Sequence, residues 1–249
     1  MNHSVFGEAA IELNFTLEKW CLWQIDQPPV DPWPGGEILP YHEGLADAGF
    51  LPLMQRRRLT PLARAALAVA WHCREEHEQL PAVFCSDHGE SQAYFAMLNH
   101  LAGAEQLSPS QFSLSVHNAI AGLYSLYSAS KAPYVALAGG QESLFAAFLE
   151  VAGMLAENPA TAVLVVWYEQ PLPQVYGAYA PSPKAPLALA MRLSCGNQGL
   201  TLRLTRHADE GKMSPTHPLE AFSQAVSVGL RQARHPLERS CWRWELLDE

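Results

Sequence analysis

The chain has 249 residues, of which 49% are hydrophobic, and a formal net charge of −9 at pH 7. This length and composition fit one large globular domain or two small ones. The negative charge argues against nucleic acid or an anionic membrane as the main partner. No apolar run approaches the roughly 18 residues that a transmembrane helix needs.

The N-terminal segment lacks the basic start and the continuous apolar stretch of a secretory signal peptide. The five cysteines are scattered, with no Cys-x-x-Cys pair, which favours reduced thiols over disulfides or a zinc site. His72 and His77 are five residues apart on a predicted helix and would lie on different faces. We therefore expect a cytoplasmic protein with no metal and no cofactor.

The first part of the chain alternates predicted strands and helices. The sequence predicts a strand at residues 10–25, a proline-rich loop at 28–40 and an alanine-rich helix at 54–78. A strand at 80–85 and a helix at 92–101 follow. After a Ser108-Pro109 turn comes an amphipathic segment through Asn118 and Gly122.

The most regular stretch follows, from residue 134 to residue 169. A short apolar run at residues 134–138 leads to a Gly-Gly step, an apolar helix at 142–156 and a β-rich run at 162–167. A strand, a glycine turn, a buried helix and a second strand are typical of a parallel α/β sheet.

The remainder is predicted to add strands and one helix. A loop at residues 171–186 leads to two strands, at 185–193 and 199–206, which are joined as a hairpin at Gly196-Asn197. A linker at 208–218, a helix at 219–234 and a strand at 241–247 follow.

Several motifs stand in a fixed order in this pattern. They are Ser108-Pro109, Asn118, Ala121-Gly122, Ala132-Pro133, Gln141 eight residues after that proline, and Glu169 at a strand end. Their order resembles the central part of a β-ketoacyl synthase, a condensing enzyme of the thiolase fold. In that family the nucleophilic cysteine stands eight residues after the proline, on a sharp turn that leads into a buried helix.

The resemblance implies an α/β fold, a thiolase-like mixed sheet with helices on both faces, truncated in its second half. Residues 1–206 would form the ketosynthase-like N-terminal half. Residues 207–249 would be a short remnant of the C-terminal half, with one helix and one strand.

The resemblance also implies that the chain has no ketosynthase activity of its own. The family needs a thiolate at a helix N-terminus and two histidines from the second half. Gln141 holds the place of the thiol, and His207, His217 and His235 lie in no segment that matches the histidine motifs of the family.

Glutamine often replaces this cysteine in chain-length factors of type II polyketide systems and in decarboxylating loading ketosynthases. A loading decarboxylase would still need the histidines, so the first assignment is favoured. The simplest alternative is that Gln141 is an ordinary helix-start residue in a decayed site.

The chain is therefore expected to be a chain-length factor that forms a heterodimer with an active β-ketoacyl synthase. It would shape the acyl tunnel in type II polyketide or aryl polyene biosynthesis and meet the acyl carrier protein. The resemblance suggests three groups of residues. The strand at the interface with the ketosynthase would be Tyr134, Val135, Ala136, Leu137, Ala138 and Gly139. The acyl tunnel would be lined by Tyr94, Phe95, Leu98, Gln111 and Phe112, and the carrier protein would dock on Arg56 and Arg57.

Each of these assignments has a plainer alternative. The aromatic row beginning at Tyr94 has helical spacing and would serve equally in core packing. Arg56, Arg57 and Arg58 would be a solvated helix start, although three cations there oppose the helix dipole.

Two other classes of function stay open. One is an orphan thiolase-like hydrolase or decarboxylase that uses Cys85 or Ser86, with Asp87 and His88 nearby; neighbouring residues in a loop rarely converge, which favours a buried structural cysteine. The other is a structural scaffold that binds a partner without a role in the tunnel.

Overall fold

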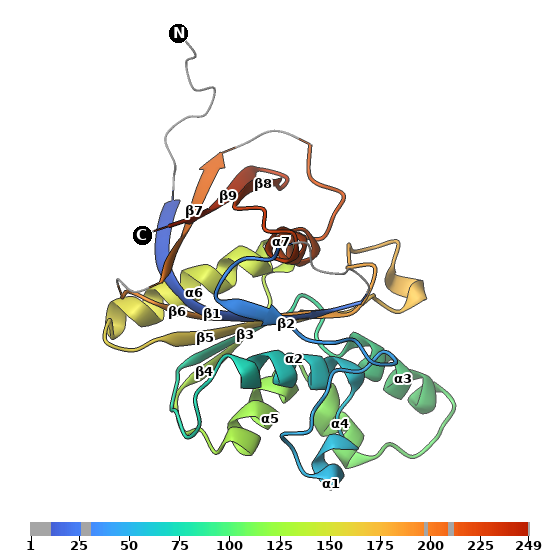
Figure 1. The fold of residues 1–249 in the computed structure, drawn as a ribbon. Helices are drawn as coiled ribbons and strands as arrows, with labels where there is room; N and C mark the ends of the chain where they lie inside the picture. The colour runs from blue at the N-terminus through green and yellow to red at the C-terminus, as the bar shows by residue number, and fades with distance from the viewer. Residues whose placement is uncertain (1–10, 26–30, 197–198, 209–211, 249) are drawn as a thin grey trace.

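The computed structural model describes residues 11–25, 31–196, 199–208 and 212–248. The described residues form one mixed sheet with helices on both faces (Figure 1). Its strands are β1 (Ile11–Gln24), β2 (Gly36–Ile38), β3 (Ala82–Cys85), β4 (Tyr134–Leu137), β5 (Val163–Glu169), β6 (Leu187–Ser194), β7 (Leu200–Ala208), β8 (Gln232–Pro236) and β9 (Ser240–Leu247).

The sheet has a parallel end and an antiparallel end. Its order is β4-β3-β5-β6-β1-β7-β9-β8, with β2 paired to the second half of β1. Strands β4, β3 and β5 are parallel, and every pair from β5 to β8 is antiparallel. The predicted mixed α/β sheet of the thiolase type is confirmed.

Helices cover both faces of this sheet. Helix α6 (Ser143–Glu157) and helix α7 (Pro218–Ser227) lie on one face, and α2 (Pro61–His72) and α5 (Ala119–Ser128) lie on the other (Figure 1). Helices α1 (Leu53–Arg56), α3 (Ser91–Ala102) and α4 (Pro109–Ser115) extend beyond the α2 and α5 layer, and 3-10 turns η1 (Gly140–Glu142) and η2 (Gln174–Tyr176) complete the described elements. No described helix is long and apolar enough to cross a membrane.

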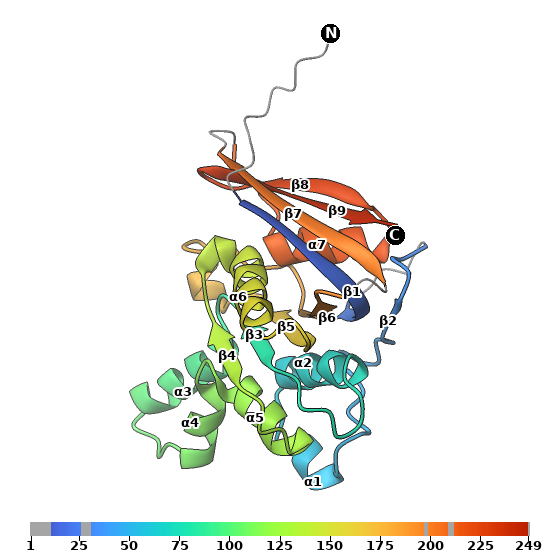
Figure 2. The same ribbon diagram turned by 90° about the vertical axis from the view of Figure 1, so that its left-hand side faces the viewer.

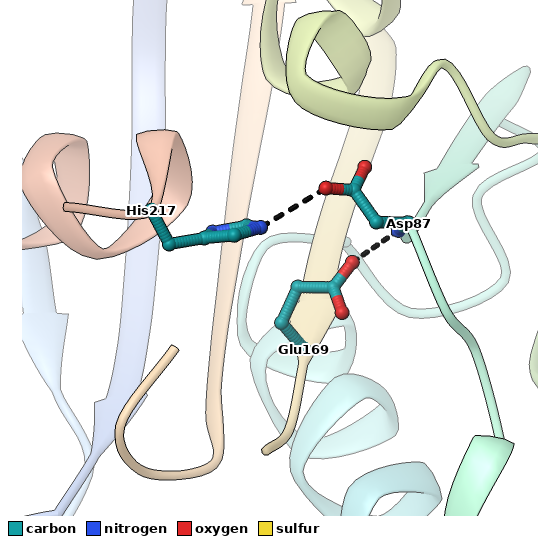
Figure 3. Close-up of side chains that lie close together, drawn as sticks. All are labelled: Asp87, Glu169 and His217. Carbon is teal, nitrogen blue, oxygen red and sulfur yellow. Dashed lines mark hydrogen bonds and ion pairs between the residues drawn. The ribbon is translucent and has the colours of Figure 1, made fainter. Parts of the chain in front are cut away.

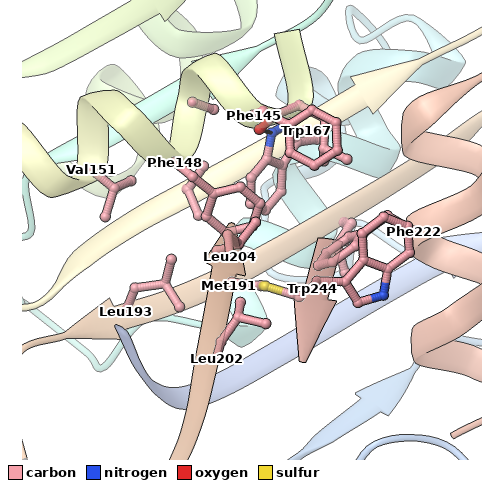
Figure 4. Packing of buried hydrophobic residues seen from close by; sticks show 14 of the residues in the cluster. Phe145, Phe148, Val151, Trp167, Met191, Leu193, Leu202, Leu204, Phe222 and Trp244 are labelled. Atoms are coloured by element: carbon pink, nitrogen blue, oxygen red, sulfur yellow. Dashed lines mark hydrogen bonds between the residues drawn. The ribbon is translucent and has the colours of Figure 1, made fainter. Parts of the chain in front are cut away.

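Aromatic side chains fill the core between the sheet and α6 and α7 (Figure 4). Phe145 stacks on Trp242 with ring centroids 4.5 Å apart, and Phe148 lies 4.8 Å from Trp167. Each buried ring removes a large apolar area from water. The core thus joins α6, from the middle of the chain, to strands at its C-terminal end.

Helix α2 is shorter than the sequence predicts. Thr60 caps it by accepting a hydrogen bond from the Ala63 N–H at 3.0 Å, and Pro61 occupies the first turn. Proline lacks an N–H, so it starts a helix and does not continue one. The single helix predicted at 54–78 is therefore wrong: α1 ends at Arg56, and α2 begins at Pro61 and ends at His72.

The strands at residues 187–194 and 200–208 do not form the predicted hairpin. Strand β1 lies between them, pairing with β6 through residues 16–24 and with β7 through residues 11–17. A strand of 14 residues is long enough to take a different neighbour along each half. Asn197 of the predicted turn, like residue 10 of the first predicted strand, is outside the described residues.

Three further predictions of secondary structure are wrong in part. The helix predicted at 219–234 ends at Ser227, and β8 follows a glycine turn whose Gly229 has φ +68°. The amphipathic segment after Ser108 is two helices, α4 and α5. The loop predicted at 28–40 contains β2, while its residues 28–30, and residues 209–211 of the predicted linker, lie outside the described part of the chain.

The predicted boundary at residue 206 falls inside β7. Strands β8 and β9 continue the same sheet, and α7 shares the core of α6. The assignment of residues 207–249 as a remnant of a second half stays a prediction.

Candidate functional site

The glycine turn between β4 and α6 carries Gln141. Gly140 has φ +60°, a conformation that glycine adopts without strain. The Gly139 N–H donates to Ser143 Oγ at 2.6 Å, which fixes the start of α6. Gly139 and Gly140 are exposed, and Gln141 is half-buried.

A small cavity lies behind this turn, where the parallel strands β3 and β5 end. Its volume is about 10 Å³, which is room for about one water molecule. It is lined by Cys85, Ser86, Asp87, Gly140, Gln141, Ser143, Leu144, Trp167, Glu169, His217, Pro218 and Leu219. The carboxyl ends of parallel strands meet at one sheet edge, so their side chains and the following loops are brought together.

Cys85 and Ser86 both lie at this edge of the sheet, and both are buried. Cys85 is 1% exposed, and its Sγ donates to the Ser143 carbonyl at 3.2 Å. Burial, and then the charge of Asp87, raises the pKa of the Cys85 thiol well above its ordinary value. Ser86 Oγ accepts from the Gly89 N–H at 2.7 Å, and His88 Nε2 lies 3.1 Å from the Pro181 carbonyl.

Three side chains from separate elements converge at the cavity: Asp87 after β3, Glu169 at the end of β5, and His217 at the N-cap of α7 (Figure 3). His217 Nε2 lies 3.0 Å from Asp87 Oδ2, and the Asp87 N–H donates to Glu169 Oε1. The side chains of Asp87 and His217 are both 4% exposed, and Glu169 is 2% exposed.

The carboxyl group of Glu169 is held mostly protonated at neutral pH. Burial is the largest cause, the Asp87 charge is the second, and the hydrogen bond from the Asp87 N–H partly opposes them. Together they raise the pKa of Glu169 to about 8. The predicted position of Glu169 at a strand end is confirmed.

The sequence did not indicate that a histidine reaches this cavity. His217 is 130 residues from Asp87 along the chain, and no motif marks it. His235 on β8 is also buried, and burial, followed by the charge of His217, lowers its pKa to about 4. The one signal in the sequence is Pro218, which starts α7. A proline at the first position of a helix indicates that the residue before it, here His217, is the N-cap.

The predicted tunnel residues lie away from the cavity, on α3 and α4. Tyr94 is 48% and Phe112 is 56% exposed, while the Phe95 ring meets Tyr176 edge-on at 5.5 Å. Gln111 and Phe112 were expected in a loop, but they belong to α4. Leu98 is half-buried on α3.

The predicted docking arginines are not at the start of a long helix. Arg56 is the last residue of α1, and Arg57 caps its C-terminal end. A cation there is favoured by the helix dipole, so the argument from dipole opposition is wrong. Arg57 is exposed, Arg56 is half-buried, and the neighbouring Leu53 and Met54 are 53% and 67% exposed.

The predicted interface strand is an edge of the sheet. The N–H groups of Ala82 on β3 and of Ser86 just after it donate to the carbonyls of Pro133 and Leu137, each at 3.1 Å. In a parallel ladder alternate residues face the same neighbour, so the backbone groups of Tyr134 and Ala136 face away from β3.

The chain matches a known protein family over most of its length. Residues 30–245 match the family model of the β-ketoacyl synthase N-terminal domain. A comparison with curated protein sequences found no match.

Solved structures show the same fold. A chain of a ketosynthase (ApeO) in complex with its chain length factor (ApeC) from Xenorhabdus doucetiae superimposes with a TM-score of 0.73 at 22% identity, covering 94% of this chain and 99% of that one. The ishigamide ketosynthase/chain length factor matches with a TM-score of 0.53 at 14% identity, over 64% of this chain and 51% of that one.

A β-ketoacyl synthase from Burkholderia phymatum STM815 matches with a TM-score of 0.53 at 13% identity, over 74% of this chain and 57% of that one. This chain thus spans between half and three fifths of the two longer structures. The family model covers most of the chain, and we conclude that the protein belongs to the β-ketoacyl synthase family through its N-terminal domain.

Proposed function

We propose that this chain is a non-catalytic subunit of the chain-length-factor type, which pairs with an active β-ketoacyl synthase and shapes its acyl tunnel. The observation that carries the proposal is Gln141 on the glycine turn that leads into α6. A condensing enzyme needs a thiolate at that helix N-terminus, and an amide side chain cannot form a thioester.

The similarity in length supports the same proposal. The match covers 99% of a chain from a complex of a ketosynthase with its chain length factor, so that chain is about as long as this one. Aryl polyene or type II polyketide biosynthesis is the pathway class that we propose.

Strand β4 is the proposed interface with the ketosynthase. Its outward backbone groups are available for pairing, and its side chains carry no charge. Exposed apolar edges associate readily with another strand. Tyr94 and Phe112 would then close the far end of the tunnel that the partner contributes.

The acyl carrier protein is the second proposed partner. Arg57, Leu53 and Met54 form an exposed basic and apolar patch at α1. Such a patch is complementary to an acidic amphipathic helix.

Co-expression with a complete β-ketoacyl synthase encoded beside this chain is the direct test. We expect a one-to-one complex that makes products only when both chains are present. Full activity of the ketosynthase alone, with an unchanged product length, would contradict the proposal.

The rival hydrolase is tested on the purified chain alone. We expect no acyl adduct after incubation with an acyl carrier donor, measured by intact mass, because Cys85 is buried and its thiol pKa is raised. A stable adduct that disappears in Cys85→Ala would favour the rival.

A further inference from the structure

The cluster of Asp87, Glu169 and His217 has the composition of a metal site. Each residue offers one ligand atom, and these atoms lie within 4.8 Å of one another (Figure 3). They come from three elements that are distant in sequence but meet at the carboxyl ends of β3 and β5. A site built from rigid elements holds its ligands more precisely than one built within a single loop.

Two carboxylate oxygens in this cluster have no hydrogen-bond partner among the described residues. They are Asp87 Oδ1 and Glu169 Oε2, and both are shielded from solvent. The Glu169 carboxyl group also interacts with Ser86 and with the His88 backbone, so Asp87 Oδ1, on a side chain that is 4% exposed, is the stronger of the two observations. Leaving a buried charged group without a partner is costly, so buried carboxylates are normally paired or coordinate a metal. The cavity of about 10 Å³ beside them has room for one small species.

We propose that Asp87, Glu169 and His217 bind a divalent first-row metal ion such as Zn²⁺ or Mn²⁺. Two carboxylates and one imidazole are ligands that these ions accept. His217 Nε2 and Asp87 Oδ2 lie 3.0 Å apart. Neighbouring ligands at about 2.1 Å from the metal are about 3.0 Å apart around an octahedral ion such as Mn²⁺ and about 3.4 Å apart around tetrahedral Zn²⁺, so little movement is needed for either ion.

The ion would take the one place that the cavity offers, on the side where Gln141 and the exposed glycine turn lie. The bound ion would displace the proton of Glu169, balance both carboxylates and hold the start of α7 against the ends of β3 and β5. Its place is structural, and it does not depend on the proposed pairing with a ketosynthase.

Zinc titration of the full-length protein tests the site. The exposed Cys195 is first changed to serine, to remove an accessible thiol that would itself bind zinc. Isothermal titration calorimetry should then give one Zn²⁺ per chain, and thermal unfolding with and without Zn²⁺ should show a raised Tm. The isosteric variants Asp87→Asn and Glu169→Gln should each lose more than about 100-fold in affinity, because loss even of a supporting residue costs 10–100-fold.

The surface pair of His72 and Glu37 provides the matched control. These side chains are 3.9 Å apart and solvent-exposed, and His72→Gln should leave zinc affinity unchanged. Anomalous scattering at the zinc edge, from crystals of the Cys195→Ser protein, locates the ion without relying on the folding of a variant. Equal zinc affinity of the Glu169→Gln variant, or loss of zinc binding in the His72→Gln variant, would overturn the proposal. Crystals without an anomalous signal between the three side chains would overturn it as well. So would failure to bind either Zn²⁺ or Mn²⁺.

Discussion

The two edges of the sheet are protected in different ways. Strand β8 presents Gln232, Arg234 and Pro236 to the open side, since Arg231 and Leu237 bond to β9 and alternate residues face the same way. A charge and a proline on an edge discourage further pairing. Strand β4 lies at the other edge of the sheet (Figure 2) and presents Tyr134 and Ala136, with neither a charge nor a proline.

This difference indicates which edge is built for a partner. The β4 edge packs against α5, and Tyr94, Leu101 and Phe112 are exposed on α3 and α4. Monomeric proteins seldom leave large apolar patches in water, and those that occur mark interaction sites. The predictions below test whether the β4 side, and not the β8 side, carries the function.

The largest effect is expected from Tyr134→Pro. It removes an outward-facing N–H from β4 without touching the hydrogen bonds to β3, so the chain should fold but lose its partner. We expect affinity for the ketosynthase to fall at least about 100-fold in surface plasmon resonance. The matched change Gln232→Pro, at an outward position on β8, should leave binding intact; equal losses from both changes would contradict the asymmetry.

A smaller effect is expected at the carrier patch. Arg57→Glu, alone or with Arg56→Glu, should weaken binding of the acyl carrier protein to the complex by about tenfold and flatten its salt dependence. The single variant is the cleaner one, because Arg56 is half-buried. Arg239→Glu, at an exposed position near β8, is the control. An equal loss of carrier binding in that variant would show that net charge, and not the patch at α1, determines the binding.

Product length tests the aromatic residues on α3 and α4. Phe95→Ala or Phe112→Ala should give longer products from the reconstituted complex, because the shorter side chain opens space and removes no reacting group. Mass spectrometry of the products measures the shift. Leu230→Ala, which is exposed at the far side of the molecule, is the control. An unchanged distribution with an intact complex would rule out the tunnel role.

A separate effect concerns pH and the stability of the fold. Glu90 at the N-cap of α3 is 4% exposed and accepts a hydrogen bond from Thr60 Oγ1 at 2.5 Å. Burial raises the pKa of Glu90 from 4.5 to about 7, an effect that the Thr60 hydrogen bond partly offsets. The folded state therefore favours the protonated acid, so its contribution is fully present below pH 4.5 and is lost as the pH rises through 7.

Urea unfolding at a series of pH values measures this contribution. The free energy of unfolding of the wild type should fall by on the order of 2 kcal/mol more than that of Glu90→Gln between pH 5 and pH 8. The exposed Glu105→Gln should follow the wild type. If the free energy of unfolding changes with pH in the same way for the wild type and Glu90→Gln, ionisation of Glu90 does not destabilise the folded state.

The sequence alone determined the unit from residue 134 to residue 169. Its apolar runs, its Gly-Gly step and its helical periodicity are local signals, and β4, α6 and β5 lie where they were predicted. Gln141 was assigned to the nucleophile position by the resemblance, which counts eight residues from Pro133, and that role stays a prediction. The local pattern predicted the glycine turn itself, where Gly140 has φ +60°.

Only the tertiary structure decided the strand order and the cluster of Asp87, Glu169 and His217. Strands adjacent in sequence are usually neighbours, which predicted a hairpin of β6 and β7. The insertion of β1 between them depends on pairing across more than 160 residues. His217 likewise reaches Asp87 because the core fixes α7 against the sheet. Periodicity reports which face of an element is buried, and it carries no information about which distant element will cover that face.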